Sequence, residues 1–294
     1  MAIRARLAVM LALLAVAAGV AAAGAEDRVR PTPSHVVLIV LENHEYDQVL
    51  GNPEAPYLNG LARRGALATR YYAVAHPSLP NYLALLGGST FGVTENCTDC
   101  RARGSNLALQ LSRAGISWRA YMGGMPRPCF RGDEAGDYVK RHDPFMYFPS
   151  IADVPRRCSQ VVPEGRLDAD LRRRSLPTFA WLSPDLCNDG HDCGIAVADR
   201  HLSNLVPRIA RQLGPDGLLV VTFDEGTSAA GCCGAAGGGH VVTIVVGPGV
   251  PRGARLNRPY DHYSLLAALE DRFGLPRLRR ARAATALRAA CRKS

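Results

Sequence analysis

Short apolar runs recur along the chain and alternate with stretches in which apolar residues follow helical spacing. Six runs have the length and composition of buried strands, and they span residues 35–41, 67–73, 118–121, 178–182, 218–223 and 241–246. Five stretches are expected to form helices, at residues 57–64, 81–86, 106–114, 196–213 and 262–273. Strands that alternate with helices predict an α/β fold, in which a mostly parallel central sheet carries helices on both faces of a single domain.

The two ends of the chain differ from this pattern. Arg4 and Arg6 precede an apolar run, and small residues at positions 23–25 then match a cleavage site. We expect residues 1–25 to be a secretory signal peptide, because the run is short for the alternative, a membrane anchor. Residues 26–275 are expected to form the folded domain, with a less regular cap or long loops at 122–176, and residues 276–294 form a basic tail.

The formal net charge of +9 comes from the two ends of the chain. Residues 26–275 hold equal numbers of acidic and basic side chains, whereas the tail has only basic ones. Such a tail could contact a membrane, a cell wall or nucleic acid, or it could be a solvated end, and we favour the solvated end. No basic stripe is interleaved with aromatic residues, so we expect no nucleic-acid partner. Membrane contact is expected only through this tail or through a lipid substrate.

Nine cysteines predict disulfide bonds if the protein is exported, and they stand at positions 97, 100, 129, 158, 187, 193, 232, 233 and 291. Cys97–Cys100 and Cys187–Cys193 are the expected pairs, because each closes a short loop. Adjacent cysteines bridge each other only with strain, so the state of the pair at 232 and 233 stays open. The odd number leaves at least one thiol free or paired between chains.

Acidic and amide residues directly follow two of the expected strands. Glu42 and Asn43 come after the strand at 35–41, and Asp224 and Glu225 come after the strand at 218–223. Ligands of α/β proteins bind beyond the carboxyl ends of the strands. One such carboxylate could simply cap a helix. Two groups together favour a metal site, because clustered carboxylates repel one another unless a cation neutralises them.

Ser78 stands at the start of an expected helix, between two prolines, in the segment AHPSLPNY at 75–82. Backbone N–H groups at a helix start bind anions, and the side-chain amide of Asn81 could reach a phosphoryl oxygen. A serine in this position is usually only an N-cap. It becomes a nucleophile where a base or a metal lowers the pKa of its hydroxyl, and the acidic strand ends could hold that metal.

Three histidines are further candidates. His191 lies in a loop after the strand at 178–182, and His240 lies between a glycine run and the next strand. Both are candidate general acids for a leaving group. His262 follows Asp261 at the start of the last helix, where capping by Asp261 is the simpler explanation, so we favour a structural role for His262.

These segments, in this order, resemble the phosphoesterase family that contains bacterial acid phosphatases and phospholipases C, within the alkaline phosphatase superfamily. The matching stretches are VLIVLENHEYDQVLG (37–51), ATRYYAVAHPSLPNYLALLGGST (68–90), LSPDLCNDGHDCG (182–194), VVTFDEG (220–226), GGGHVVTIVVGPGV (237–250) and YDHYSLLAALEDRFGL (260–275). The resemblance implies an alkaline-phosphatase-like fold and a metal-dependent phosphoric-ester hydrolase in residues 26–275, most simply a secreted phosphomonoesterase.

The resemblance also implies roles for individual residues. Ser78 would be the nucleophile and form a phosphoserine, and Glu42, Asn43, Asp224 and Glu225 would ligate one divalent cation. Three further positions are Asp185, His191 and His240. In two-metal members of the superfamily the matching residues hold a second ion, and in single-metal members they face the phosphate. Glu225 stands where the two-metal enzymes have histidine, which puts the second ion in doubt.

This interpretation depends on one spatial expectation. The five residues at positions 42, 43, 78, 224 and 225 must converge at one edge of the sheet, with the hydroxyl of Ser78 within roughly 8 Å of the acidic group. The identity of the metal, the natural substrate and the oligomeric state stay open.

Three alternatives differ in chemistry. A sulfatase needs Cys or Ser in a C/S-x-P-x-R motif, whereas Tyr82 stands here in place of the arginine. A phospholipase C or another phosphodiesterase would use the same site and differ in the shape of its pocket. A catalytically inactive binding protein could share the fold, since a fold alone does not prove activity.

Overall fold

The computed structural model describes residues 34–290, and the expected signal peptide lies outside this range. An eight-stranded sheet has the order β11-β2-β10-β9-β1-β8-β4-β7. Its strands are β1 (Val36–Leu41), β2 (Ala66–Ala68), β4 (Trp118–Met122), β7 (Val161–Pro163), β8 (Phe179–Ser183), β9 (Leu218–Phe223), β10 (Thr243–Val246) and β11 (Arg255–Leu256). All neighbouring pairs are parallel except those that β10 makes with β2 and β9. The predicted mostly parallel sheet is therefore confirmed.

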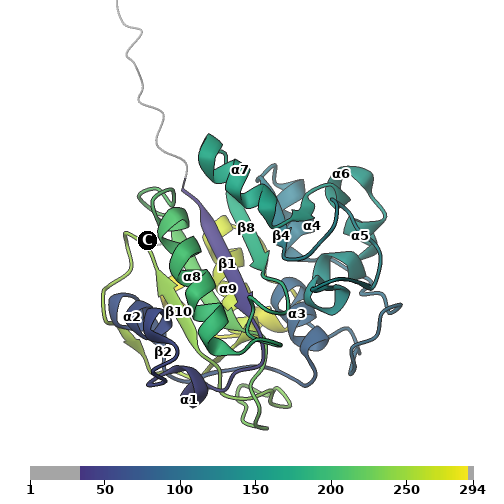
Figure 1. The fold of residues 1–294 in the computed structure, drawn as a ribbon. Helices are drawn as coiled ribbons and strands as arrows, with labels where there is room; N and C mark the ends of the chain where they lie inside the picture. Colours follow the sequence, from purple (N-terminus) through teal and green to yellow (C-terminus); the bar gives the residue numbers. More distant parts are fainter. Residues whose placement is uncertain (1–33, 291–294) are drawn as a thin grey trace, which may run out of the picture. The chain divides into compact units, whose positions relative to one another are not determined.

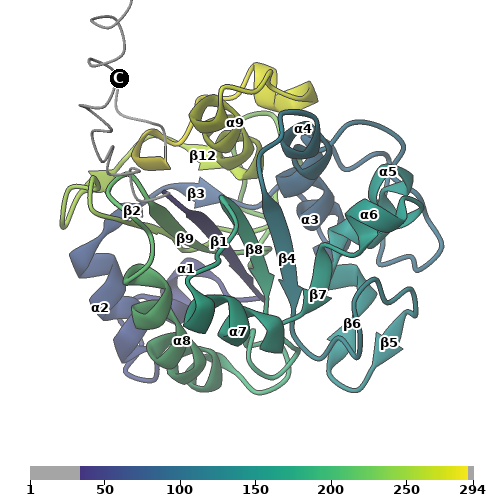
Figure 2. The same ribbon diagram turned by 90° about the horizontal axis from the view of Figure 1, so that it is seen from above.

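Helices cover both faces of this sheet, as Figures 1 and 2 show. One face carries α2 (Pro56–Arg64), α7 (Gly165–Arg173) and α8 (Ile195–Ala210), and the other carries α3 (Ser78–Gly87), α4 (Leu107–Arg113) and α9 (His262–Phe273). The central strand β1 is consequently buried along its whole length, which is why its sequence, VVLIVL, is apolar at every position. Trp181 of β8 is the largest fully buried side chain and packs edge-on against Phe145.

The stretch at 67–73, expected as one strand, forms two. β2 belongs to the large sheet, whereas β3 (Tyr71–Tyr72) pairs in parallel with β12 (Tyr260–Asp261) in a separate two-stranded sheet. The chain thereby leaves the large sheet just before the segment that leads to Ser78. The short helix α1 (Tyr46–Val49) follows the carboxyl end of β1.

Residues 122–176, expected as a cap or long loops, contain many short elements. They are β5 (Glu134–Ala135), β6 (Tyr138–Val139), the 3₁₀ helices η1 (Lys140–His142) and η2 (Pro144–Tyr147), α5 (Pro149–Ala152), α6 (Pro155–Cys158), β7 and α7. The region therefore supplies an edge strand to the sheet and one of its covering helices. It also places η1 against α3, which matters for the site.

Four disulfides join the eight cysteines of residues 34–290. The predicted pairs Cys97–Cys100 and Cys187–Cys193 are confirmed. Cys129 bonds Cys158 within the cap region, and the adjacent Cys232 and Cys233 bond each other. Cys291 lies outside the described residues. Disulfides are typical of proteins in oxidising compartments.

The first part of the basic tail packs on the domain. It contains η3 (Arg279–Arg282) and η4 (Arg288–Ala290), and its apolar side chains, among them Ala281 and Leu287, are buried. Arg279 donates hydrogen bonds to the carbonyl oxygens of Gly87 and Ser105. Up to residue 290 the tail is thus part of the folded domain. Within residues 34–290, every helix is too short or too polar to cross a membrane.

Candidate active site

The carboxyl ends of β1 and β9 place acidic side chains side by side. Leu41 is in register with Phe223 in the parallel ladder, so the residues that follow, Glu42 and Asp224, leave the sheet as neighbours. Both are fully buried, and Glu225 is nearly so. Three carboxyl groups therefore lie together in the protein interior, an arrangement that is costly unless protons or a cation neutralise them.

Ser78 is the first residue of α3, which starts beside this group. Its hydroxyl donates hydrogen bonds to Glu225 Oε1 at 2.9 Å and to Glu42 Oε2 at 3.2 Å. Ser78 as a residue is only 2% exposed, so its hydroxyl faces the carboxylates and not bulk water. The predicted convergence of α3 with the two strand ends is thus present in the structure, well within the expected 8 Å.

Asn43 joins the group through its backbone and its side chain. Its φ angle of +50° lies in the left-handed region, which asparagine tolerates better than most residues. This conformation directs its N–H to Asp224 Oδ1, at 3.3 Å. Its side-chain oxygen is buried and makes no hydrogen bond within residues 34–290, and the same holds for Asp224 Oδ2.

Two further residues complete a buried cluster that the sequence did not predict. His142, from η1, has Nε2 3.3 Å from Glu42 Oε2 and Nδ1 3.2 Å from Asp189 Oδ2. Neither ring nitrogen makes a hydrogen bond with residues 34–290. Ligand atoms of Glu42, His142 and Asp189 lie within 4.8 Å of one another, so this group could hold a metal ion.

Electrostatics in this cluster follow from burial and like charge. Burial raises the pKa of Glu42 well above its ordinary value, and the neighbouring Asp224 and Asp189 raise it further. Burial, together with Glu225, raises the pKa of Asp224 in the same direction. Burial and the nearby Arg141 lower the pKa of His142, which favours the neutral imidazole that metal ions bind.

These features fit a divalent cation. The group offers carboxylate and amide oxygens with one neutral imidazole, which are ligands of hard and intermediate divalent metals. Its buried acceptors, Asn43 Oδ1, Asp224 Oδ2 and Asp189 Oδ2, have no donor among the described residues. Since buried polar atoms are normally paired, these acceptors are available to a cation.

Two more side chains contact the carboxylates around Ser78. The buried Tyr82, one turn along α3, donates a hydrogen bond from its hydroxyl to Glu42 Oε1. His76 pairs through Nδ1 with Glu225 and through Nε2 with the carbonyl oxygen of Ser228. Burial opposes the charged form of His76, but Ser228 and Glu225 outweigh it and raise the pKa of the imidazole.

Asn81 and His240 are held by other groups. The Asn81 side-chain oxygen accepts from the N–H groups of Val74 and Ala75, and its amide donates to the carbonyls of Ala75 and Pro77. Asn81 therefore fixes the turn before Ser78. The ring of His240 stacks between Tyr46 and Tyr72, and its Nε2 contacts the carbonyl oxygen of Thr69.

His191 and His262 also adjoin the cluster. The ring centroid of His191 lies 5.9 Å from that of His142, and its Nδ1 is 2.6 Å from Asp192 Oδ1. His262 is buried between the Tyr71 hydroxyl and the carbonyl oxygen of Asp224, at 3.1 and 2.5 Å. His262 therefore holds the backbone at the end of β9 through the carbonyl oxygen of Asp224, which is the kind of structural role that the sequence favours.

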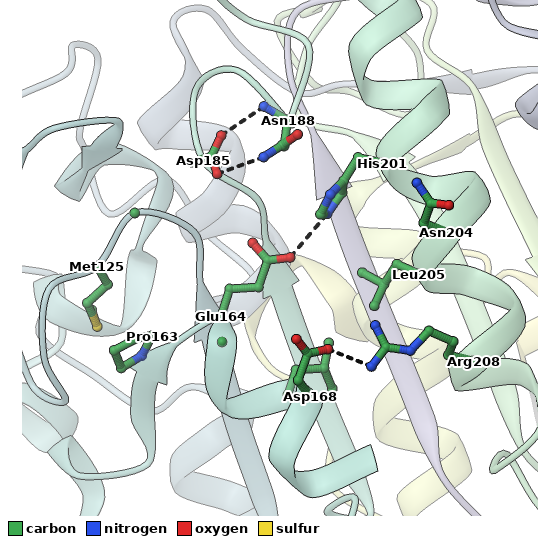
Figure 3. Close-up of a pocket in the computed structure, with 13 residues that line it drawn as sticks. Met125, Pro163, Glu164, Asp168, Asp185, Asn188, His201, Asn204, Leu205 and Arg208 are labelled. Atoms are coloured by element: carbon green, nitrogen blue, oxygen red, sulfur yellow. Dashed lines mark hydrogen bonds and ion pairs between the residues drawn. The ribbon is translucent and has the colours of Figure 1, made fainter. Parts of the chain in front are cut away.

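Asp185 lies at a cavity beside this cluster, shown in Figure 3. Its carboxylate binds the backbone and side chain of Asn188, within the loop that also carries Asp189. The cavity has a volume of about 500 Å³ and lies between α7 and α8. Two ion pairs join these helices across it, Glu164–His201 at 3.1 Å and Asp168–Arg208 at 2.6 Å.

Comparison with known proteins identifies the family of this chain. Residues 52–276 match the Phosphoesterase family. The chain belongs to this family. It is a hydrolase of phosphoric esters, as the names of its relatives also indicate.

Two relatives and one solved structure illustrate the similarity. The chain is 34% identical to a phosphatidylinositol-3-phosphatase of Mycobacterium tuberculosis, over 84% of this chain and 79% of that protein. It is 33% identical to a phosphate-repressible acid phosphatase of Penicillium chrysogenum, over 83% of this chain but only 60% of that longer protein. A protein in the alkaline phosphatase superfamily from Vibrio parahaemolyticus shares the fold, with a TM-score of 0.59 and 13% identity over 85% of this chain and 70% of that one.

Proposed function

We propose that this protein is a secreted, metal-dependent phosphomonoesterase in which Ser78 is the nucleophile. The observation that carries the proposal is the position of the Ser78 hydroxyl, 2.9 Å from Glu225 and 3.2 Å from Glu42 at the start of α3. A serine hydroxyl is a weak nucleophile until its proton has an acceptor. Here two buried carboxylates are in place to accept it.

One divalent cation would be held by Glu42, Asn43, Asp224 and Glu225. When bound, such an ion lowers the pKa of the attacking hydroxyl and draws charge from the phosphoryl group. The residues of the chain set the geometry around it. Tyr82 orients the Glu42 carboxylate, and His76 orients that of Glu225 while remaining bonded to Ser228.

The chemistry would proceed in two displacements. The Ser78 oxygen forms a bond to phosphorus, its proton passes to the adjacent carboxylate pair, and the bond from phosphorus to the alcohol oxygen breaks. We assign the protonation of the departing alcohol to His191, because its ring lies 5.9 Å from that of His142 and its side chain is partly exposed to solvent. Water then attacks the phosphoserine, releases inorganic phosphate and restores the Ser78 hydroxyl.

The cluster of Glu42, His142 and Asp189 is where a second ion would bind. A metal analysis of the purified protein distinguishes the two cases. With two ions, His142→Ala lowers the bound metal from about two equivalents to about one, whereas with one ion its metal content stays unchanged.

Monoesters are the favoured substrates because the relatives found by sequence are named as phosphatases, among them several acid phosphatases. A secreted location is supported by the four disulfides. A phosphodiesterase or phospholipase C would use the same nucleophile, so the substrate decides between them.

The test is a substrate panel with wild type and Ser78→Ala. We expect p-nitrophenyl phosphate and other monoesters to be cleaved at least tenfold faster than bis(p-nitrophenyl) phosphate or phosphatidylcholine. Ser78→Ala should lose at least about a thousandfold in kcat while its melting temperature is retained. Activity of this variant near the wild-type level would remove Ser78 from the mechanism, and preference for a diester would replace the monoesterase assignment.

A further inference from the structure

One flank of the domain carries several arginines and no acidic residue. Two segments that meet there, residues 55–76 and 241–260, contain neither aspartate nor glutamate but six arginines, at positions 63, 64, 70, 252, 255 and 258. All six arginines are exposed. Residues 26–275 as a whole hold equal numbers of acidic and basic side chains, so this surplus of positive charge is local.

Parallel pairing brings the six arginines to one edge of the large sheet. β11, the outermost strand, pairs with β2, and Arg255 is in register with Leu67. The helix α2, which ends at Arg64, leads directly into β2 and packs against it at the same flank (Figure 1). The arginines at 63, 64 and 252 precede these two strands, and those at 70 and 258 follow them. The six therefore extend along the whole edge, which we call the arginine edge.

No carboxylate forms an ion pair with the arginine edge within residues 34–290. The arginines that form ion pairs there stand at other positions, namely 101, 119, 131, 166, 208 and 277. Arg64 contacts the ring of Tyr57, with its guanidinium carbon 5.8 Å from the ring centroid. A charge on an edge strand usually prevents pairing with another chain, which accounts for Arg255, but the other five arginines lie outside β11. Like charges spread along one flank favour an anionic partner.

An apolar cavity adjoins the arginine edge. It has a volume of about 280 Å³, and Val250, Pro251 and Leu256 line it. Its other lining residues include Asp216 and Arg288, which is exposed on η4. The edge therefore combines positive charge with apolar surface, as proteins that bind at a membrane interface do.

The distribution of these groups distinguishes between anionic partners. A small anion is bound by donors that converge on one point, whereas the arginine edge runs the length of β2 and β11. A nucleic acid is read by an element that enters a groove or by aromatic side chains that stack on bases, and β11 is a two-residue strand without an aromatic residue. An anionic phospholipid surface fits both the spread of charge and the apolar cavity, because its phosphates lie in a plane above acyl chains.

We propose that the arginine edge docks this protein on an anionic phospholipid membrane. The arginines contact lipid phosphates, and the apolar residues around the cavity face the acyl chains at the membrane surface. The bound phosphates are diesters that stay intact, so this inference does not depend on the proposed role of Ser78. The arginine edge is also distinct in sequence from the basic tail at 276–294.

Vesicle binding tests the proposal. Wild type should co-sediment with vesicles of phosphatidylcholine that contain about 30% phosphatidylglycerol, and not with phosphatidylcholine alone, because the attraction needs anionic lipid. Raising the salt concentration to about 0.5 M should release the protein, since salt screens exposed charges. The combined changes Arg252→Gln, Arg255→Gln and Arg258→Gln should weaken binding about 100-fold at a retained melting temperature, which is about fivefold per arginine.

Two further variants separate the arginine edge from net charge and from the stability of one loop. Arg63→Gln with Arg64→Gln removes two charges from α2 and should weaken binding about 20-fold, even if the triple variant folds poorly. Arg113→Gln, Arg172→Gln and Arg173→Gln together remove three exposed arginines from elsewhere on the domain. This control should bind within about threefold of wild type, because charges distant from the contact are screened.

The proposal is wrong if wild type stays in solution with the anionic vesicles, or if the control loses as much binding as the edge variants. It is also wrong if Arg292→Gln with Lys293→Gln abolishes binding while the edge variants retain it, because the contact then lies in the basic tail. Equal affinity for a double-stranded oligonucleotide would show a surface for polyanions in general, and would overturn the assignment to lipid.

Discussion

Two regions of the molecule, one on the helix α7 and one at the ends of β1 and β9, bury carboxylates in opposite ways. Asp170, on α7, is 1% exposed and is surrounded by donors. The Tyr121 hydroxyl lies 2.9 Å from Oδ2 and Arg166 Nε lies 3.0 Å from Oδ1. At the ends of β1 and β9, by contrast, Glu42, Asp224 and Glu225 face one another, and within residues 34–290 no arginine or lysine forms an ion pair with them.

The two regions consequently differ in the direction of their pKa shifts. Burial acts to raise the pKa of Asp170, but Tyr121, Arg166 and Arg119 together outweigh it and lower that pKa. For Asp224, burial and the adjacent Glu225 raise the pKa to about 8. A buried carboxylate with partners stabilises a fold, whereas a cluster without them is maintained for function. Four experiments test whether this contrast holds.

Removing metal should produce the largest effect. Exhaustive dialysis against EDTA is expected to abolish phosphatase activity and to lower the melting temperature, because the cluster at the strand ends then regains its repulsion. Adding back a divalent cation should restore both. Full activity in protein shown to be metal-free by elemental analysis would contradict a metal role for this region.

Asp224→Asn should reduce kcat/KM on the order of a thousandfold, since several kcal/mol of transition-state stabilisation would be lost with a metal ligand. In metal-free buffer above about pH 8, where Asp224 is ionised, the same variant should be at least as stable as wild type, because one of the repelling charges is gone. Denaturant unfolding in EDTA measures this. A variant that is both active and destabilised would place Asp224 in the structural class of Asp170.

Asp170→Asn is the matched change in the other region. It removes the charge that Arg119 and Arg166 pair with, so the free energy of unfolding should fall by about 3 kcal/mol. The kcat/KM of the folded fraction is expected to remain within about twofold of wild type, since Asp170 lies outside the site. A large loss of activity without loss of stability would show that the two regions are coupled.

Replacing Glu270 should give the smallest of these effects, a change in how the free energy of unfolding depends on pH. Burial raises its pKa from 4.5 to about 8, although the Leu278 N–H donates to it. The folded state then binds a proton more tightly than the unfolded state, so stability is full below about pH 4.5 and falls as pH rises through about 8. Glu270→Gln should remove this loss and gain about 2 kcal/mol at pH 8.5.

Denaturant unfolding of wild type and Glu270→Gln at pH 5 and pH 8.5 measures the difference. Equal stability changes with pH in the two proteins would show that Glu270 does not titrate in this range. Glu270 is not one of the proposed metal ligands, so the comparison does not depend on metal binding.

The sequence predicts helices and strands accurately where the local pattern of apolar residues determines their bounds. The strand at 218–223 and the helix at 262–273 have the bounds that their apolar periodicity indicates. For the stretch at 67–73, the local pattern predicts one strand, because its residues favour strand locally. The division into β2 and β3 depends on pairing with β10 and β12, which lie more than 170 residues further along the chain.

The residues of the site also fall into those that the local sequence predicts and those that only the fold brings together. Glu42, Asp224 and Glu225 could be found because each directly follows a strand, and the parallel ladder brings such positions together. His142 could not, because it lies in a region of short elements whose packing no local pattern reveals. The only feature of the sequence that pointed to His142 as a site residue is that histidine is a common metal ligand. Asp189 stood within the NDGHD segment that the sequence singled out, but only the fold shows that its side chain, and not that of Asp185, faces His142.

The sequence by itself determined the sheet and its helices, the acidic strand ends and the serine at the start of α3. These features follow from periodicity and from the geometry of parallel strands, which act over a few residues. The tertiary structure decided which polar groups from distant loops meet at that edge, and which are used up elsewhere, as in Asn81. Hydrogen bonds and burial depend on neighbours in space, and these are set only when the whole chain has packed.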